Sequence, residues 1–133
     1  MKAPIQKLNP KESEVMKQLR FYLDRRFGEL GWVHIPNEQM AGPKRIGLLR
    51  ASGLKKGFPD ILIFEGVYSP RNSGYEGDIV YWGMAIEVKR ERGGKLSPEQ
   101  AEYLDYFSAI GWATAVGRGY QDTINKIEEV YGK

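Results

Sequence analysis

A run that we expect to form one long strand, residues 78–89, ends in the sequence Ala85-Ile86-Glu87-Val88-Lys89. Side chains two residues apart on a strand share a face, so Glu87 and Lys89 point together. Ile86 and Val88 then point to the opposite face. An acid flanked by apolar residues is costly to bury unless a cation compensates its charge. Lys89 is one such cation, and a divalent metal ion would be a stronger one.

A second buried strand is expected at residues 61–64, where Ile-Leu-Ile-Phe form a continuous apolar run directly after Pro59-Asp60. We expect this strand to lie beside the strand that carries Glu87, which would bring Asp60 close to Glu87. Two carboxylates at one place make a hard-oxygen site for Mg²⁺, with water and substrate as the remaining ligands. Such a site suits phosphodiester hydrolysis, in which Lys89 contacts the scissile phosphate or orients the attacking water.

The first helix is expected to run from about residue 10 to residue 27, with Asn9 as its N-cap. Its apolar stripe includes Val15 and Leu19. Glu12 lies three residues before the first and seven before the second, so it shares the face turned toward the sheet. Glu14 projects roughly 100° away from that stripe and should be more exposed. The helical geometry therefore favours Glu12 as a third carboxylate of the site.

The other elements follow from turn and cap signals. The clearest is Ser97-Pro98-Glu99-Gln100, a capping box that should start a helix ending at Gly111. Further strands are expected at 32–35 and 112–116, further helices at 43–51 and 120–131, and an exposed connection at 69–77. The order α-β-α-β-β-α-β-α predicts an α/β fold with a mixed central sheet flanked by helices.

The composition limits the chemistry. A chain of 133 residues and 15.2 kDa suits a single domain, residues 1–133. It contains no cysteine and one histidine. Disulfides, cysteine-ligated zinc, iron–sulfur clusters, thiol catalysis and multi-histidine metal sites are thereby excluded. The sequence shows neither a membrane span nor a secretory signal, and we expect a cytoplasmic location.

Positive charge is concentrated in the first part of the chain, although the net charge is only +3. Residues 1–60 hold 12 Lys or Arg against 6 Asp or Glu, whereas residues 61–133 hold 8 against 11. The segment 39–59 contains no acid and five basic residues: Lys44, Arg45, Arg50, Lys55 and Lys56. A basic stretch without acids is typical of a site for a polyanion.

The motifs carry a resemblance to a known family. The ordered set is Ile35-Pro36-Asn37, Lys44-Arg45, residues 53–60 (GLKKGFPD), residues 86–90 (IEVKR), residues 93–100 (GGKLSPEQ) and Gly111-Trp112. In this set the chain resembles the VRR-NUC branch of the PD-(D/E)XK nuclease superfamily, in its small stand-alone form. The resemblance covers almost the whole chain and implies a restriction-endonuclease-like fold.

The resemblance also implies site residues. Asp60 and Glu87 would be metal ligands together with the backbone carbonyl of Val88. Lys89 would be the catalytic lysine. Gln100 matches the family's glutamine on the following helix, near the site.

The resemblance does not decide which acid of the first helix is the functional one. Glu12-Ser13-Glu14-Val15 resembles the Glu-x-Glu-aliphatic opening of archaeal Holliday-junction resolvases, in which the first Glu is the functional one. This agrees with the helix-face argument for Glu12, and Glu14 stays open as the alternate. The chain departs from the family in Phe58, where small or β-branched residues are usual, and in a long insertion at 68–77.

The function implied is a Mg²⁺-dependent DNA endonuclease, with Mn²⁺ able to substitute. Branched DNA, such as a Holliday junction, is a candidate substrate, and the family implies a homodimer acting in a bacterial or phage-infected cell. Two alternatives remain open: a non-catalytic DNA-binding module of the same fold, and a nuclease for single-stranded DNA or RNA. The residues expected to contact DNA phosphates are Lys44, Arg45, Arg50, Lys55, Lys56 and Arg90.

Overall fold

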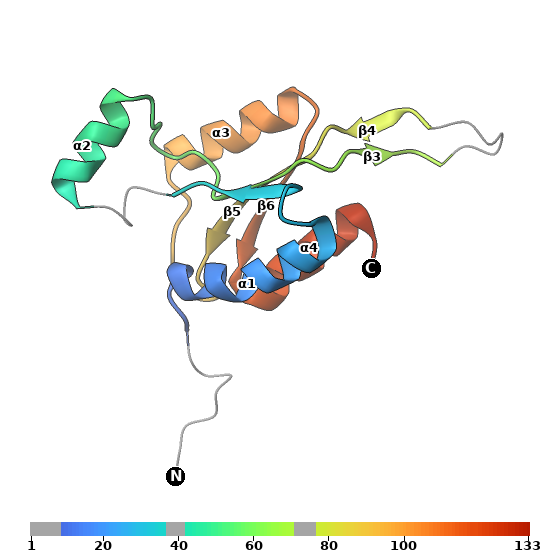
Figure 1. Cartoon of the computed structure of the whole chain (residues 1–133), viewed down its shortest axis with the longest axis horizontal. Coiled ribbons are helices and arrows are strands. Elements are labelled where there is room, and N and C mark those ends of the chain that lie inside the picture. Colours follow the sequence, from blue (N-terminus) through green and yellow to red (C-terminus); the bar gives the residue numbers. More distant parts are fainter. Residues whose placement is uncertain (1–8, 37–41, 71–76) are drawn as a thin grey trace, which may run out of the picture.

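The computed structural model describes residues 9–36, 42–70 and 77–133, and it is drawn in Figure 1. Its helices are α1 (Glu12–Phe27), α2 (Pro43–Ala51), α3 (Pro98–Ala109) and α4 (Gly119–Tyr131). Its strands are β1 (Trp32–His34), β2 (Ile61–Ile63), β3 (Val67–Tyr68), β4 (Ile79–Tyr81), β5 (Met84–Lys89) and β6 (Ala113–Arg118). Asn37 of the first motif and residues 71–76 of the predicted connection lie outside the described residues.

The central sheet has the strand order β1-β2-β5-β6. β5 pairs antiparallel with β2 and parallel with β6, so the sheet is mixed, as predicted. Helices α1 and α4 lie side by side on one face of this sheet, and α3 covers the other (Figure 1). All six residues of β5 are buried because helices cover both of its faces. That the single domain extends over residues 1–133 stays a prediction.

Helix α1 is held by its apolar stripe. Val15, Met16, Leu19 and Leu23 are buried against the strands and α4. Each fully buried side chain of this size contributes roughly 1.5–3 kcal/mol, which is far more than the helix propensity of any single residue. This packing fixes the rotation of α1 about its axis, and with it the direction in which the acids of the first turn point.

The predicted N-cap of α1 is wrong. The helix begins at Glu12, and the N-cap position is Lys11, which makes no side-chain cap hydrogen bond. The Asn9 side chain instead bonds the backbone of Arg92, donating from Nδ2 to the carbonyl (2.7 Å) and accepting at Oδ1 from the N–H (3.1 Å). Asn9 therefore ties the start of the described chain to the turn after β5 rather than capping the helix.

The single long strand predicted at 78–89 is also wrong, because the chain bends at Trp82-Gly83. There the sheet admits no side chain: a Cβ on Gly83 would lie 2.4 Å from the Ile63 carbonyl oxygen. β4 leaves the central sheet at this bend and pairs with β3, a strand that the sequence did not predict. β3 and β4 together project from the body (Figure 1), and the predicted connection at 69–77 lies between them in the sequence.

Helix α2 stands away from the sheet (Figure 1), and none of its residues is buried. Its Pro43 occupies the first helical turn, as expected from the sequence. Within the described part of the chain, no helix is long and apolar enough to cross a membrane.

Candidate active site

Asp60 and Glu87 lie opposite each other where β2 begins. The register pairs Ile61 with Ile86, so the next antiparallel pair in the same register is Asp60 and Glu87. Asp60 immediately precedes the strand, and its carboxylate Oδ2 accepts a hydrogen bond of 2.7 Å from the buried N–H of Val88. The side chain of Asp60 thus takes the place of a backbone partner and is held against β5. The two carboxyl groups expected to meet do so.

Glu87 points from β5 toward α3. Its Oε1 accepts a hydrogen bond of 2.8 Å from Gln100 Nε2. Gln100 Oε1 accepts from the Ser97 N–H (2.8 Å), and the Ser97 hydroxyl accepts from the Gln100 N–H (3.2 Å). The predicted capping box is therefore present, and its glutamine has a second task, because the same amide that caps α3 also orients Glu87.

Lys89 occupies the end of β5 on the same face as Glu87. Its Nζ lies 3.9 Å from Glu87 Oε1 and 4.0 Å from Glu12 Oε1. Only 8% of the lysine side chain is exposed, so the carboxyl groups of Glu12 and Glu87, rather than water, surround its charge. The ammonium group is thereby held between an acid of the sheet and an acid of α1.

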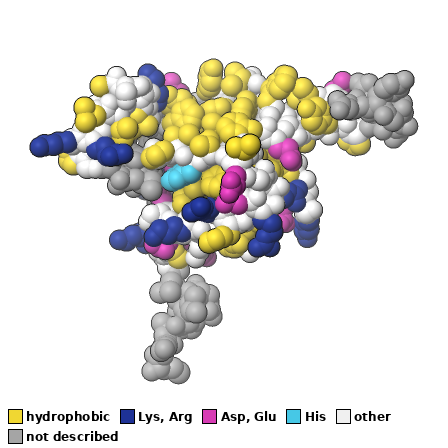
Figure 2. Space-filling model, in the orientation of Figure 1, with side chains coloured by type: hydrophobic (Ala, Val, Ile, Leu, Met, Phe, Trp, Pro, Cys, Tyr) yellow, Lys and Arg dark blue, Asp and Glu magenta, His cyan; other side chains and the backbone are white. Residues whose placement is uncertain are grey.

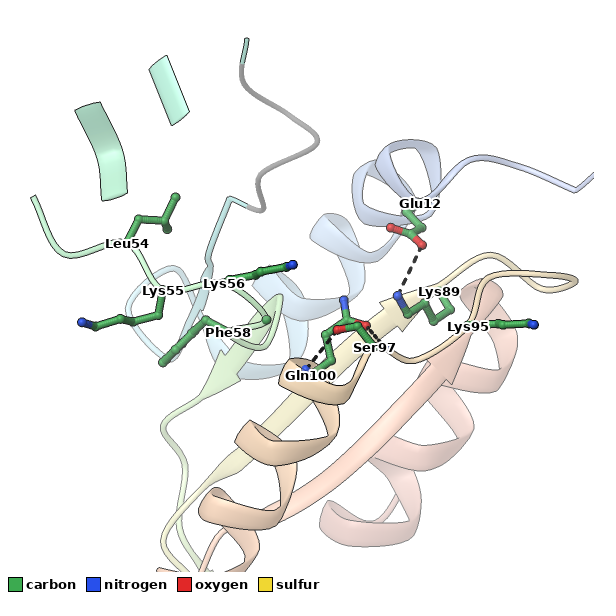
Figure 3. Close-up of a pocket in the computed structure, with 10 residues that line it drawn as sticks. Glu12, Leu54, Lys55, Lys56, Phe58, Lys89, Lys95, Ser97 and Gln100 are labelled. Atoms are coloured by element: carbon green, nitrogen blue, oxygen red, sulfur yellow. Dashed lines mark hydrogen bonds and ion pairs between the residues drawn. The ribbon is translucent and has the colours of Figure 1, made fainter. Parts of the chain in front are cut away.

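The two acids in the first turn of α1 differ in their surroundings. The side chain of Glu12 is 24% exposed and faces Lys89 (Figure 3), whereas that of Glu14 is 55% exposed and pairs with Lys17 on the helix surface at 3.3 Å. The structure therefore brings Glu12 to the cluster and leaves Glu14 on the outer side. The catalytic role of either acid stays a prediction.

Burial makes the carboxyl groups of the cluster resist ionisation. It is the largest cause of the raised pKa of Glu87, about 9, and the Asp60 carboxylate adds to it. Burial also raises the pKa of Asp60, against the hydrogen bond from the Val88 N–H. The pKa of Glu12 is raised by its partial burial, and Lys89 opposes this shift. The charge on Asp60 therefore disfavours ionisation of Glu87 unless a cation lies between the two groups.

The donor set at Asp60 and Glu87 fits a hard divalent cation. Glu87 Oε2 is buried and, among the described residues, has no hydrogen-bond partner, so an oxygen is left over for a ligand. Within the same described ranges, no three His, Cys, Asp or Glu side chains gather closely enough to hold a metal ion. Glu12 faces Lys89 in this structure, and its role as a further metal ligand, or that of Glu14, stays a prediction. The carbonyl of Val88 as a further ligand stays a prediction.

A groove of about 210 Å³ opens beside this cluster (Figure 3), and we refer to it as the lysine groove. Of the residues that the structure describes, one acid lines it, Glu12, together with four lysines: Lys55, Lys56, Lys89 and Lys95. Lys55 and Lys56 reach it because Gly57 packs tightly on the first turn of α3. A Cβ on Gly57, whose φ is +83°, would lie 2.7 Å from the carbonyl carbon of Glu99. The groove is suited to an anion such as a phosphate.

The remaining basic residues lie in two places. Lys44, Arg45 and Arg50 are exposed on α2, where Figure 2 shows Lys and Arg side chains gathered at the left of the molecule. Arg90 behaves differently, because its guanidinium is partly buried and donates to the Asn9 carbonyl at 2.7 Å. It helps to hold the segment before α1, and a contact with DNA stays a prediction for it.

Ser97 is a residue of the site that the sequence predicts only as a helix cap, whereas Lys95, just past the strand with Lys89, is also expected to extend the basic patch. Both line the lysine groove, and both follow Gly93-Gly94, a pair of positive-φ glycines that turns the chain back after β5. The available signal was this glycine pair, because a tight turn directly after the strand with Lys89 keeps the next residues near the site. The single histidine, His34, is half-buried near Asp60, and burial lowers its pKa.

Comparisons with known proteins give one consistent result. The family model of the VRR-NUC domain matches residues 29–121, which is more than half of the chain. A solved structure named "VRR_NUC domain protein" is similar to this chain with a TM-score of 0.70 and 19% sequence identity. The likeness covers 92% of this chain and 89% of that one. None of the curated proteins matches.

Proposed function

The chain belongs to the VRR-NUC domain family, a family of nuclease type with a PD-(D/E)XK-like fold, and we propose that it is a Mg²⁺-dependent DNA endonuclease. One observation carries the proposal: Asp60, Glu87 and Lys89 meet at one end of β5, next to a groove lined with lysines. Phosphodiester cleavage needs compensation of phosphate charge and a positioned water, and this cluster can supply both.

The residues of the chain have separable tasks in this proposal. Asp60 and Glu87 would hold the metal ion, with Val88 as a backbone ligand. When bound, the ion supplies charge neutralisation at the phosphate and lowers the pKa of a water molecule. Lys89 contacts the scissile phosphate or orients the attacking water. Gln100 positions Glu87 by its hydrogen bond.

The direct test is a cleavage assay on labelled DNA. The protein is incubated with a four-way junction, a flap, a blunt duplex and single-stranded DNA, each with Mg²⁺, Mn²⁺ or EDTA. We expect cleavage with either metal and none with EDTA. Binding without cleavage of any DNA in either metal would contradict the proposal and favour a DNA-binding module. Cleavage of RNA or single-stranded DNA alone would show that the substrate is that nucleic acid and not duplex or branched DNA.

The two acids of α1 provide a matched pair. We expect Glu12→Gln to slow cleavage roughly 10- to 100-fold, because it removes a carboxylate that holds Lys89 in place. Glu14→Gln should stay near the wild-type rate, since its partner is the exposed Lys17. The comparison is made by single-turnover kinetics with protein in excess. Equal rates for the two variants would contradict the assignment of Glu12.

The exposed basic residues of α2 are proposed to bind DNA phosphates at a distance from the cluster. Neutralising Lys44 and Arg45 together should weaken binding of all DNA sequences alike. It should also reduce the slope of log K against log salt by about 2, one unit for each phosphate that the protein no longer neutralises. Fluorescence anisotropy at several salt concentrations measures this slope, with Arg25→Ala on α1 as the control. An unchanged slope would show that Lys44 and Arg45 of α2 do not contact DNA phosphates.

Branched DNA and a homodimer complete the proposal. Two copies related by a twofold axis would present two sites to a symmetric junction. The β3–β4 hairpin and the bend after it expose large apolar side chains, Tyr68, Ile79, Val80 and Trp82, which a second copy could cover. Light scattering gives the number of subunits in solution. A DNA substrate is also the reason to propose action in the cytoplasm of a bacterial or phage-infected cell.

A further inference from the structure

A second cavity adjoins the lysine groove on the outer side of α3. It has a volume of about 310 Å³ and is lined by Lys56, Glu99, Glu102, Tyr103 and Tyr106. We refer to it as the tyrosine pocket. Lys56 also lines the lysine groove, so the two cavities share a wall. The mechanism proposed above uses no other residue of this pocket, and its size is at the lower end of ordinary ligand sites.

The pocket is built on one face of α3. Positions 99, 102, 103 and 106 are spaced by three and four residues, so their side chains form a stripe on the helix surface. Tyr103 is held by the edge of Phe58 at 5.2 Å between ring centroids, and Tyr106 by Phe107 at 6.0 Å. Tyr106 is nevertheless 56% exposed. Figure 2 shows hydrophobic side chains gathered over α3 in this view. A supported but exposed aromatic ring is a surface on which another ring can stack.

The charges of the two cavities are complementary to different groups. The lysine groove carries four lysines and one acid, which suits an anion. The tyrosine pocket carries two acids and one lysine, and that lysine is paired with Glu99 at 3.6 Å. A phosphate would be repelled there. A neutral aromatic ring with N–H donors at its edge would stack on the tyrosine and donate to the carboxylates, and nucleobases have this chemistry.

From this juxtaposition we propose that the tyrosine pocket binds one unstacked nucleobase of the strand whose phosphate lies in the lysine groove. The proposal rests on the proposed nuclease function and narrows its substrate. A base inside a continuous duplex is paired and stacked, so it cannot enter the pocket without being extruded. The inference therefore narrows the proposed branched substrates to DNA with an unpaired nucleotide beside the cleavage site, such as a flap, a fork or a single-stranded tail, in preference to a fully paired four-way junction.

The test is a binding measurement in EDTA at fixed salt, so that cleavage plays no part. Fluorescence anisotropy compares a duplex carrying a single-stranded tail with a blunt duplex of the same total length. Tyr106→Ala should weaken binding of the tailed DNA about 5- to 150-fold, the range for loss of one base–aromatic stack, and should leave the blunt duplex unchanged. Tyr106→Phe keeps the ring and should bind as the wild type does. Tyr120→Ala, on α4 across the sheet, is the matched control.

Three results would overturn the inference: equal affinity of the wild-type protein for tailed and blunt DNA, an unchanged affinity in Tyr106→Ala, or an equal loss on both DNAs. Thermal unfolding of Tyr106→Ala checks that the exposed side chain is not needed for folding. The experiments also distinguish a failure of this inference from a failure of the proposed nuclease function. A tail-specific loss in Tyr106→Ala, together with no metal-dependent cleavage by the wild-type protein, would retain the base pocket and refute the nuclease.

Discussion

Replacing Lys89 by alanine is expected to lower the rate of DNA cleavage about 100- to 1000-fold, the usual effect of removing one charge-stabilising donor from an active site. The ammonium group lies within 4.0 Å of both Glu12 and Glu87, and its side chain is 8% exposed. A charge held in such surroundings interacts strongly with a phosphate because little water screens it. The rate is measured with Mg²⁺ under single-turnover conditions, so that slow product release does not hide the chemical step.

The control for Lys89 is another lysine of the same chain. The side chain of Lys17 on α1 is 75% exposed. The Lys17→Ala variant should therefore cleave DNA at the wild-type rate. DNA binding in EDTA separates a chemical role from a binding role, because Lys55, Lys56 and Lys95 still line the groove in Lys89→Ala. Full cleavage by Lys89→Ala would show that the site is misassigned or that the activity belongs to a contaminant.

The meeting of Asp60 and Glu87 could be predicted because it depends on short-range rules. Side chains alternate between the two faces of a strand, and the apolar sequences of both strands predict that they are buried. Once Ile61 pairs with Ile86, Asp60 at the start of one strand lies opposite Glu87 on the other. The direction of Glu12 could be predicted for a similar reason, since the buried stripe of α1 sets the rotation of the helix. The periodicity of the strand or helix, together with its buried face, determines where these acids point.

The features that could not be predicted depend on contacts between distant segments. Asn9 has the right chemistry for an N-cap, but Arg92, 83 residues away, competes for its side chain. The bend at Gly83 arises where the Ile63 carbonyl and the Trp112 ring approach the backbone. A glycine inside an apolar run is the available signal for this close approach, although the apolar run as a whole predicts a continuous strand.

The tyrosine pocket could not be predicted from the sequence. In the sequence, the helix after Ser97 is recognised by its capping box and its apolar face. Its outer stripe becomes informative only when the loop with Lys56 and Phe58 is folded against it. The same loop lines the lysine groove, so one tight turn at Gly57 builds both cavities. Spacing along α3 can predict which residues share a face but not which segment closes the pocket.

Glu87→Gln should abolish metal-dependent cleavage and, at the same time, stabilise the protein in the absence of metal. The pKa of Glu87 is raised to about 9 in the folded chain, mainly by burial and then by Asp60, from an ordinary value of 4.5. Between these two pH values the folded state holds a proton that the unfolded state has lost. Stability therefore falls as pH rises through this window, and the neutral glutamine avoids the loss. The amide introduced by this substitution can still accept the hydrogen bond from Gln100, since it retains an oxygen.

The expected gain for Glu87→Gln at pH 8 without metal is a rise in Tm of several degrees for a domain of this size. The gain should shrink toward zero as the pH falls to 4.5, where the unfolded chain also keeps its proton. Added Mg²⁺ should raise the Tm of the wild-type protein, because it binds only the folded state, and should have much less effect on the variant.

Glu129→Gln, at an exposed position of α4, is the control and should change none of these values. A variant no more stable than the wild type at pH 8 would show that burial does not penalise the Glu87 charge. An equal Tm response to Mg²⁺ in both proteins would show that the ion binds elsewhere.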